Sequence, residues 1–375
     1  MKSIIVTLVS LAAGIQFSQA QPVHPSDESR KIQIAILFDT SGSMEGLIEQ
    51  AKSTIWKIVN IASKMSDKGK APQLEIALYD YGNDEIKTPN WIRKRTDLIA
   101  DLDSISGQLF SLRTNGGSEY CAAVIESSIN DLKWSPDPQD LRLIYIAGNE
   151  PFNQGPIDYK KILKIAASKD IIVNTIYCGP YDQGVKEFWY DGALQTQGSY
   201  FNINSNDEIR HIDTPYDKEI ISVNDSLNKT YIGYGKEGAY RANKQATEDY
   251  NASSKGYAVM SERAEAKSKS NYKNGNWDLV DGIEQGNVKL DSLRVEDLPA
   301  ELKGKSKEEQ TKYIENKKAE RTKYQNQIGE LSKKREAFIA EEMKKISETN
   351  AKKDLGSAII ESLVATAQKI GFTVD

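Results

Sequence analysis

The chain has 375 residues, of which 39% are hydrophobic and 27% charged, and its formal net charge is −5. This length suits two or three domains. The slightly acidic balance, without a basic domain or stripe, excludes a nucleic acid as the expected partner.

The first twenty residues, MKSIIVTLVSLAAGIQFSQA, have the pattern of a cleaved secretory signal peptide. One lysine precedes an apolar run, and the run ends in a small-x-small site at residues 18–20. A membrane anchor is the alternative, but the run is too short to span a bilayer comfortably. We therefore expect cleavage after Ala20, a polar linker at 21–30, and a soluble protein exported to a bacterial periplasm, to the cell surface or to the medium, with no integral membrane segment.

From residue 31, apolar strands alternate with amphipathic helices. Their spacing predicts strands at 31–39, 73–82, 141–148 and 171–179, helices at 44–65, 96–112, 116–134 and 158–170, and a helix with a last short strand within 185–203. Strands that alternate with helices of this length predict an α/β fold, in which a doubly wound, mostly parallel sheet is covered by helices on both faces.

The pattern changes near residue 213, where a mainly α-helical C-terminal domain is expected. We assign 31–212 to the α/β domain, 213–236 to a junction and 237–375 to the helical domain. Within the helical domain the apolar spacing predicts helices from Ala239 to about Tyr272, over 306–347 and over 355–372.

The helix expected at 306–347 is highly charged and keeps a near-heptad spacing of apolar residues, which is typical of a coiled coil. Arg321 and Arg335 stand at seam positions of this pattern. Because charged side chains weaken a coiled-coil seam, a helical hairpin is favoured over a long two-stranded coiled coil.

A carboxylate and two hydroxyls follow the first expected strand. Asp39, Ser41 and Ser43 form the first loop, DTSGS, and residues two apart in an extended loop project to the same side. Ligands of open parallel sheets bind at the carboxyl ends of the strands. Three hard oxygen donors at this place suit Mg²⁺, Ca²⁺ or Mn²⁺. The alternative is that Asp39 or Ser41 only caps the helix that follows.

The succession of strand, DTSGSM loop, helix, strand, GGS loop, helix, strand, helix and strand resembles a von Willebrand factor type A domain over residues 31–212. The DTSGS loop resembles the metal-ion-dependent adhesion site (MIDAS) of that family. The resemblance implies a divalent cation, Mg²⁺ in the first place with Mn²⁺ or Ca²⁺ as alternatives. It also implies that Asp39, Ser41 and Ser43 bind the cation together with Ser118, which stands in the second loop (113–120) where the family usually has a threonine.

The third loop (148–152, GNEPF) departs from the pattern of the family. The family commonly has an aspartate where this sequence has Gly148. Asn149 and Glu150, which follow the glycine, and Glu119 in the second loop are further candidates to bind the cation or to support its ligands. One missing anionic ligand weakens the binding of a hard divalent ion.

The resemblance implies an adhesion-type, protein-binding module in which an acidic side chain of a partner protein completes the coordination of the cation. The alternative is a structural or scaffolding protein of the periplasm or cell surface with a degenerate metal site, which Gly148 favours. We do not expect an enzyme, because the sequence contains no G-x-x-x-x-G-K-[ST], no G-x-S-x-G and no H-E-x-x-H.

The chain contains two cysteines, Cys121 and Cys178. An oxidising compartment allows one disulfide between them, whereas two buried free thiols are the alternative. Both residues are expected towards the carboxyl edge of the sheet, so the sequence leaves both alternatives open.

Overall fold

The structure of the protein, a computed structural model, describes residues 29–204, 207, 209, 211–346 and 354–374. The signal peptide expected at 1–20 and most of the linker expected at 21–30 lie outside the described residues. Within the described ranges, none of the helices combines the length and the apolar character that crossing a bilayer requires.

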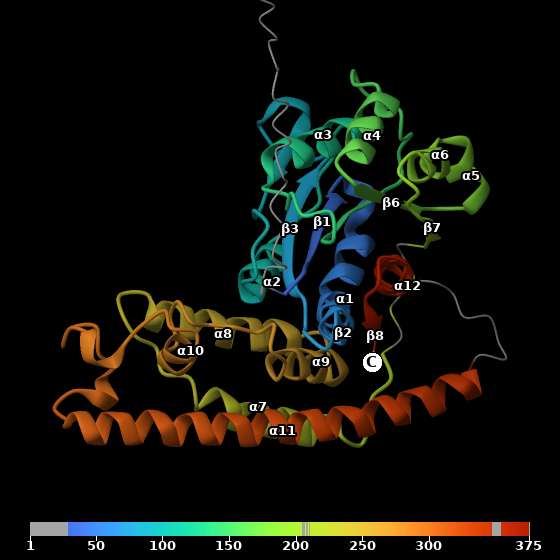
Figure 1. Ribbon diagram of the computed structural model, residues 1–375. Helices are drawn as coiled ribbons and strands as arrows, with labels where there is room; N and C mark the ends of the chain where they lie inside the picture. The colour runs from blue at the N-terminus through green and yellow to red at the C-terminus, as the bar shows by residue number, and fades with distance from the viewer. Residues whose placement is uncertain (1–28, 205–206, 208, 210, 347–353, 375) are drawn as a thin grey trace, which may run out of the picture.

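A six-stranded sheet with the order β4-β3-β1-β5-β6-β7 lies at the centre of the α/β part (Figure 1). All neighbouring strands are parallel except β3 and β4, which are antiparallel. This arrangement confirms the predicted doubly wound, mostly parallel sheet. The strands are β1 (Lys31–Asp39), β3 (Gln73–Tyr81), β4 (Ile92–Lys94), β5 (Leu141–Gly148), β6 (Ile171–Cys178) and β7 (Tyr200–Ile203).

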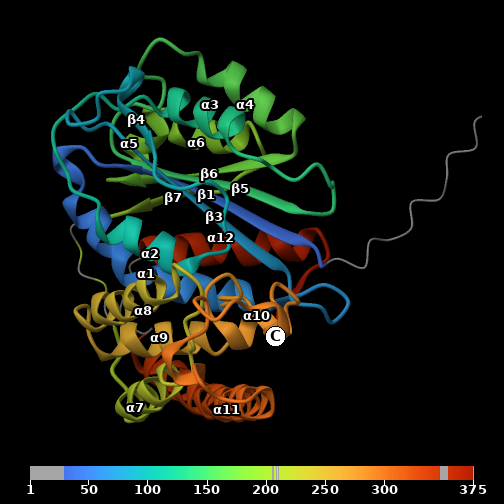
Figure 2. The ribbon, with the colours of Figure 1, turned by 90° about the vertical axis from the view of Figure 1, so that its left-hand side faces the viewer.

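Helices cover both faces of this sheet, as Figure 2 shows. Side chains alternate along β1, so that Ile34 and Ile36 face one helical layer and Ala35 and Leu37 face the other. Strands buried on both faces read as continuous apolar runs, which explains why they were recognisable in the sequence. One layer holds α1 (Glu45–Ser63), α2 (Leu102–Phe110) and α12 (Leu355–Lys369), and the other holds α3 (Cys121–Asp131), α4 (Tyr159–Ser168), α5 (Tyr181–Lys186) and α6 (Trp189–Leu194).

The last helix of the chain, α12, packs on the sheet beside α1. Its Ser362 hydroxyl donates to the Tyr145 hydroxyl of β5 at 2.8 Å, and Tyr145 donates in turn to the carbonyl oxygen of Ile359 at 3.3 Å. Leu363 is fully buried in the same core. From the sequence this helix is expected in the helical domain, whereas in the structure it covers part of one face of the sheet.

The remaining helices form further layers below α1 and α2 in Figure 2, with α8 and α9 nearer the sheet and α7 and α11 outermost. Gly256, at φ 113°, separates α8 from α9, so the single helix expected from Ala239 to Tyr272 is two helices. The elements are α7 (Asp217–Asn228), α8 (Gly238–Ser253), α9 (Tyr257–Lys267), α10 (Leu279–Glu284) and α11 (Lys307–Ile346), with short 3₁₀ turns η1 (Gly42–Met44), η2 (Pro89–Trp91), η3 (Leu290–Ser292) and η4 (Ala300–Leu302), and a two-stranded sheet of β2 (Met65–Ser66) and β8 (Thr373–Val374).

The long helix α11 packs along α7 and α9. The two arginines at its seam positions are buried and paired with carboxylates of this chain. Arg321 Nη1 lies 2.6 Å from Asp278, and Arg335 Nε lies 2.8 Å from Asp217. Because these arginines bind partners within the same chain, they act as anchors of α11 on the helical layers.

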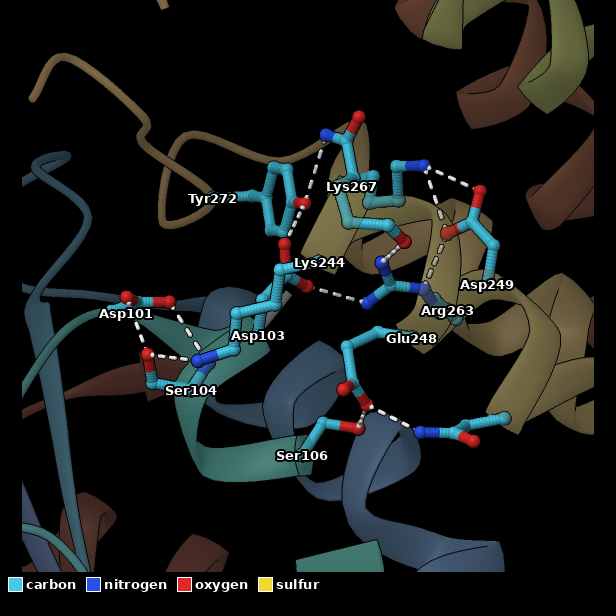
Figure 3. A network of polar contacts seen from close by, with 12 residues as sticks. Asp101, Asp103, Ser104, Ser106, Lys244, Glu248, Asp249, Arg263, Lys267 and Tyr272 are labelled. Carbon is cyan, nitrogen blue, oxygen red and sulfur yellow. Dashed lines mark hydrogen bonds and ion pairs between the residues drawn. The ribbon is translucent and has the colours of Figure 1, made fainter. Parts of the chain in front are cut away.

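A buried network of charges joins α2 to α8 and α9 (Figure 3). Arg263 of α9 donates to Asp103 of α2 at 2.8 Å and to Asp249 of α8 at 2.5 Å, and Lys267 binds Asp249 at 3.0 Å. The Tyr272 hydroxyl donates to the other oxygen of Asp103 at 2.6 Å. Since the side chains of Arg263 and Lys267 are fully buried, the network fixes the helical layers to the helix that leads into the second loop.

Candidate metal centre

The first loop begins at the point where the order of the strands reverses. From β1 the chain continues to β3 on one side, and β5 later joins β1 on the other side, so the carboxyl ends of β1 and β5 lie next to each other. This is the ligand-binding crevice of open α/β sheets. Asp39 is the last residue of β1 and lies opposite Tyr81 of β3, while Gly148 ends β5.

The Asp39 carboxylate is fully buried and only half satisfied. Its Oδ1 accepts a hydrogen bond from the backbone nitrogen of Ser41 at 2.7 Å, whereas Oδ2 has no hydrogen-bond partner. Burial, with the negative charges of Glu119 and Glu150 adding to it, raises the pKa of Asp39 to about 7 against the hydrogen bonds from Ser41. A buried carboxylate of this kind requires a proton or a cation.

The two serine hydroxyls of the first loop lie together and reach the third loop. Ser41 Oγ and Ser43 Oγ are 3.2 Å apart, and the Asn149 side-chain amide donates to Ser43 Oγ at 3.2 Å. Ser41 stands before the turn η1, but its side chain makes no capping hydrogen bond. The helix-cap alternative therefore does not account for the Ser41 hydroxyl.

The turn after β3 lies between the first and second loops and contacts both of them. Asn83, which is almost completely buried, donates from its side chain to the Thr40 carbonyl at 3.2 Å and to the Arg113 carbonyl at 3.0 Å. A Cβ on Gly117 would lie only 2.5 Å from the carbonyl oxygen of Gly82, so the backbones pass at a distance that only glycine allows. Gly117 of the GGS segment is thus required for this close approach, whereas a Cβ on Gly116 would make only an ordinary contact with Asp84.

Of the two second-loop candidates, Glu119 lies beside Asp39. Glu119 is 7% exposed. A Cβ on Gly82 would lie 2.6 Å from Cγ of Glu119 and 3.1 Å from Oδ1 of Asp39, so these two side chains border the same point. Ser118 is half-buried, and in the described part of the chain no hydrogen bond joins it to the first loop. The structure thus brings Glu119 to Asp39 and Ser41.

The third loop meets the site through its backbone and through Asn149. A Cβ on Gly148 would lie 2.8 Å from the Tyr81 hydroxyl and 3.2 Å from Asp39 Oδ2, so a side chain at this position has no room. Glu150 is half-buried, and its carbonyl oxygen accepts a hydrogen bond from Trp189 Nε1 at 2.8 Å. A carboxylate at residue 148 would therefore require Tyr81 to shift.

Both cysteines are free thiols in the structure. Cys121 Sγ lies 3.7 Å from the Tyr81 hydroxyl below Asp39, and Cys178 ends β6. Burial raises the pKa of both thiols well above the usual range. Since the thiolate is the reactive form, a raised pKa disfavours reaction of these thiols.

The polar atoms of the site decide which metal ion it could hold. Among the described residues, no group of three or more His, Cys, Asp or Glu side chains is arranged to hold a metal. The site instead offers two carboxylates, from Asp39 and Glu119, with the hydroxyls of Ser41 and Ser43 and the amide of Asn149 beside them. Oxygen donors with one carboxylate oxygen unpartnered fit a hard divalent ion such as Mg²⁺, Mn²⁺ or Ca²⁺.

Three residues that shape this site were missed in the sequence. Tyr81, Gly82 and Asn83 follow one another at the end of β3, where Tyr81 fills the space beside Gly148 and Gly82 adopts φ 72°. The available signal was the YGN triplet directly after a buried strand, since glycine and asparagine mark a tight turn there.

Similarity to known proteins is found among solved structures. No protein-family model matches the sequence, and no curated protein matches it. One match is to the SpRpn10 VWA domain, with 17% identity, a TM-score of 0.36, and coverage of 46% of this chain and 88% of that domain. Another is to BatB from Bacteroides thetaiotaomicron, with 15% identity, a TM-score of 0.36, and coverage of 46% and 90%.

A third match is to proximal thread matrix protein 1 from the mussel byssus, whose MIDAS motif is occupied by zinc. The identity is 12%, the TM-score is 0.36, and the match covers 46% of this chain and 42% of the mussel chain. The match thus spans less than half the length of the mussel protein. Likenesses at this level carry no argument about the site, so the conclusions below depend on the geometry described above.

Proposed function

We propose that the protein is a binding module that uses a divalent cation, held at the first loop, to engage an acidic side chain of a partner protein. The observation that carries this proposal is the buried Asp39 carboxylate, whose Oδ2 has no partner, beside the Ser41 and Ser43 hydroxyls at the crevice of the sheet. A cation held mainly by neutral oxygens keeps residual positive charge and an open position for a foreign carboxylate.

Each residue of the site has a role in this proposal. Asp39 supplies the negative charge that attracts the cation, and Ser41 and Ser43 supply hydroxyl oxygens on the side that faces solvent. Ser43 is exposed, whereas Asp39 lies below it, so a partner reaches the cation from the side of Ser43. Asn149 fixes the Ser43 hydroxyl through its hydrogen bond from the third loop.

Apolar side chains that are exposed on the helices beside the third loop support a protein as the partner. The indole of Trp189 at the start of α6 binds Glu150, so α5 and α6 adjoin this loop. Contiguous apolar patches on a protein surface mark sites that bind other proteins. The exposed members on α5 and α6, and between them, are Tyr181, Val185, Phe188, Tyr190 and Leu194.

The proposal is of a binding function without catalysis, in a protein that is exported through the signal peptide at residues 1–20. This proposal is supported by the sequence, which contains no G-x-x-x-x-G-K-[ST], no G-x-S-x-G and no H-E-x-x-H motif.

Calorimetric titration of the mature protein with MgCl₂ and MnCl₂ tests the proposal. The wild type is expected to release or absorb heat with a saturable profile, and Asp39→Asn, which keeps the shape but loses the charge, is expected to lose that signal. Ser222→Ala, on the exposed side of α7, is the control and should titrate like the wild type. Equal traces for the wild type and Asp39→Asn would refute the cation site.

A scaffolding protein is the second candidate function. It is favoured by the exclusion of a carboxylate at Gly148 and by the buried charges that fix α8 and α9 to α2. In that case the complex with a partner would persist in EDTA and in the Asp39→Asn variant, whereas the cation-dependent module would release its partner under both conditions.

A further inference from the structure

The site lacks one of the two negative charges that its relatives supply from separate loops, and the reason is steric. The nearest atom to a Cβ on Gly148 would be the Tyr81 hydroxyl, at 2.8 Å. Tyr81 is fully buried and its hydroxyl donates to the Ala147 carbonyl at 3.2 Å, so it has no room to move aside. A second carboxylate must therefore come from another part of the chain.

Glu119 is a buried carboxylate next to Asp39. If Gly82 carried a Cβ, that atom would lie 2.6 Å from Cγ of Glu119 and 3.1 Å from Oδ1 of Asp39. Glu119 is only 7% exposed, so its carboxylate is withdrawn from water beside Asp39. Both carboxylates have Ser41 as a hydrogen-bond partner.

No basic side chain in the described ranges compensates this pair of acids. Neither Asp39 nor Glu119 forms a salt bridge with a lysine, arginine or histidine there, although buried carboxylates elsewhere in the protein do, as Asp103 does with Arg263. Buried charges in proteins are paired with opposite charges or bind metal ions. Asp39 and Glu119 are buried acids without a salt bridge, and Oδ2 of Asp39 has no hydrogen-bond partner. These observations point to a cation between the two carboxylates.

We infer that Glu119 supplies the second anionic ligand of the cation, in place of the carboxylate that Gly148 and Tyr81 exclude from the third loop. This inference rests on the cation site proposed above. Glu150 is nearer to Gly148 in the sequence than Glu119 is. It is only half-buried, however, and its carbonyl oxygen accepts a hydrogen bond from Trp189, so we place it at the rim of the site.

Isothermal titration with MgCl₂ of the wild type, Glu119→Gln and the matched control Glu150→Gln tests the inference. Glu119→Gln is expected to weaken Mg²⁺ binding by about tenfold or more, because an anionic ligand is lost, and Glu150→Gln to weaken it by less than about threefold. If the wild type binds Mg²⁺ and Glu119→Gln binds it equally well, the inference is overturned while the proposed function stands. If the wild type itself does not bind, the proposed function fails.

A melting experiment separates a ligand from a residue that only supports the fold. In EDTA, Glu119→Gln should melt at or above the temperature of the wild type, since one of two repelling buried acids is neutralised. With MgCl₂ the wild type should rise and Glu119→Gln should not. A Glu119→Gln protein that melts lower in EDTA and still rises with MgCl₂ would overturn the inference. If Glu119→Gln does not fold, Glu119→Asp takes its place, and Mg²⁺ binding as tight as that of the wild type would overturn the inference.

Discussion

Replacing Arg263 by methionine should be one of the most destabilising changes in the helical layers. Methionine keeps much of the apolar volume beside Trp56 but removes the guanidinium, which contacts Asp103, Asp249 and the Gln245 carbonyl. Asp249 keeps Lys267 as a cation, whereas Asp103 keeps only the Tyr272 hydroxyl. Leaving one buried carboxylate without a cation costs about 3–5 kcal/mol, and this is the loss that we expect in the free energy of unfolding.

Urea unfolding followed by circular dichroism measures this loss. The control is Lys333→Met, since Lys333 pairs with Glu330 on the exposed side of α11 and its loss should leave the free energy of unfolding nearly unchanged. In the double variant Arg263→Met/Asp103→Asn the unpaired charge is gone, so roughly half of the lost stability should return. A loss below about 1 kcal/mol for Arg263→Met, or no recovery in the double variant, would refute the argument that the buried charge of Asp103 depends on Arg263.

Two further predictions concern buried acids and the third loop. Burial raises the pKa of Glu262 from 4.5 to about 7, although the charge of Arg335 opposes this shift. The folded state therefore binds the proton of Glu262 more tightly than the unfolded state, so this contribution to stability is present below pH 4.5 and is lost as the pH rises through 7. Relative to Glu262→Gln, the wild type should gain roughly 2–3 kcal/mol when urea unfolding is repeated at about pH 5 instead of pH 8, and a parallel response of both proteins would contradict the assignment. Gly148→Asp, which restores the residue usual in the type A family, should lower the free energy of unfolding by about 1–3 kcal/mol because of Tyr81, without strengthening Mg²⁺ binding in calorimetry. Tighter Mg²⁺ binding by this variant would show that the space beside Tyr81 is available.

The sequence allowed the central strands to be predicted because their burial leaves a direct trace in it. β1 and β5 are mainly apolar runs that end at Asp39 and Gly148, and β6 is a mainly apolar run followed directly by Gly179. β4 left no such trace, since its three residues contain one apolar side chain, Ile92, and it lies at the edge of the sheet. Helix α7 was taken for a junction because its apolar residues are few and a proline precedes it.

The place of α12 could not be predicted from the sequence. Its amphipathic pattern shows that one side needs an apolar surface, but the pattern is the same whether that surface is a helix or a sheet. The contact with Tyr145 of β5 depends on the path of all the intervening helices, and those are positioned by long-range ion pairs such as the one between Arg263 and Asp103.

In the candidate site, the sequence was informative for the first loop and less so for the other two. Asp39, Ser41 and Ser43 are near neighbours, so their spacing alone indicated a common direction. The choice between Ser118 and Glu119 depends on how the loop passes Gly82, which is a contact between distant segments. The exclusion of a side chain at Gly148 likewise depends on Tyr81 from another strand.

The position of α12 also has a consequence for when the protein acquires its structure. The backbone nitrogen of Leu355 donates to the side chain of Gln50, 305 residues earlier. The part of the sheet beside α1 that α12 covers stays uncovered until α12 has been made. Synthesis starts at the N-terminus, so the central strands emerge long before their cover, and contacts this distant in sequence form slowly. The core of the α/β part therefore closes only after the segment that forms α12 has been made.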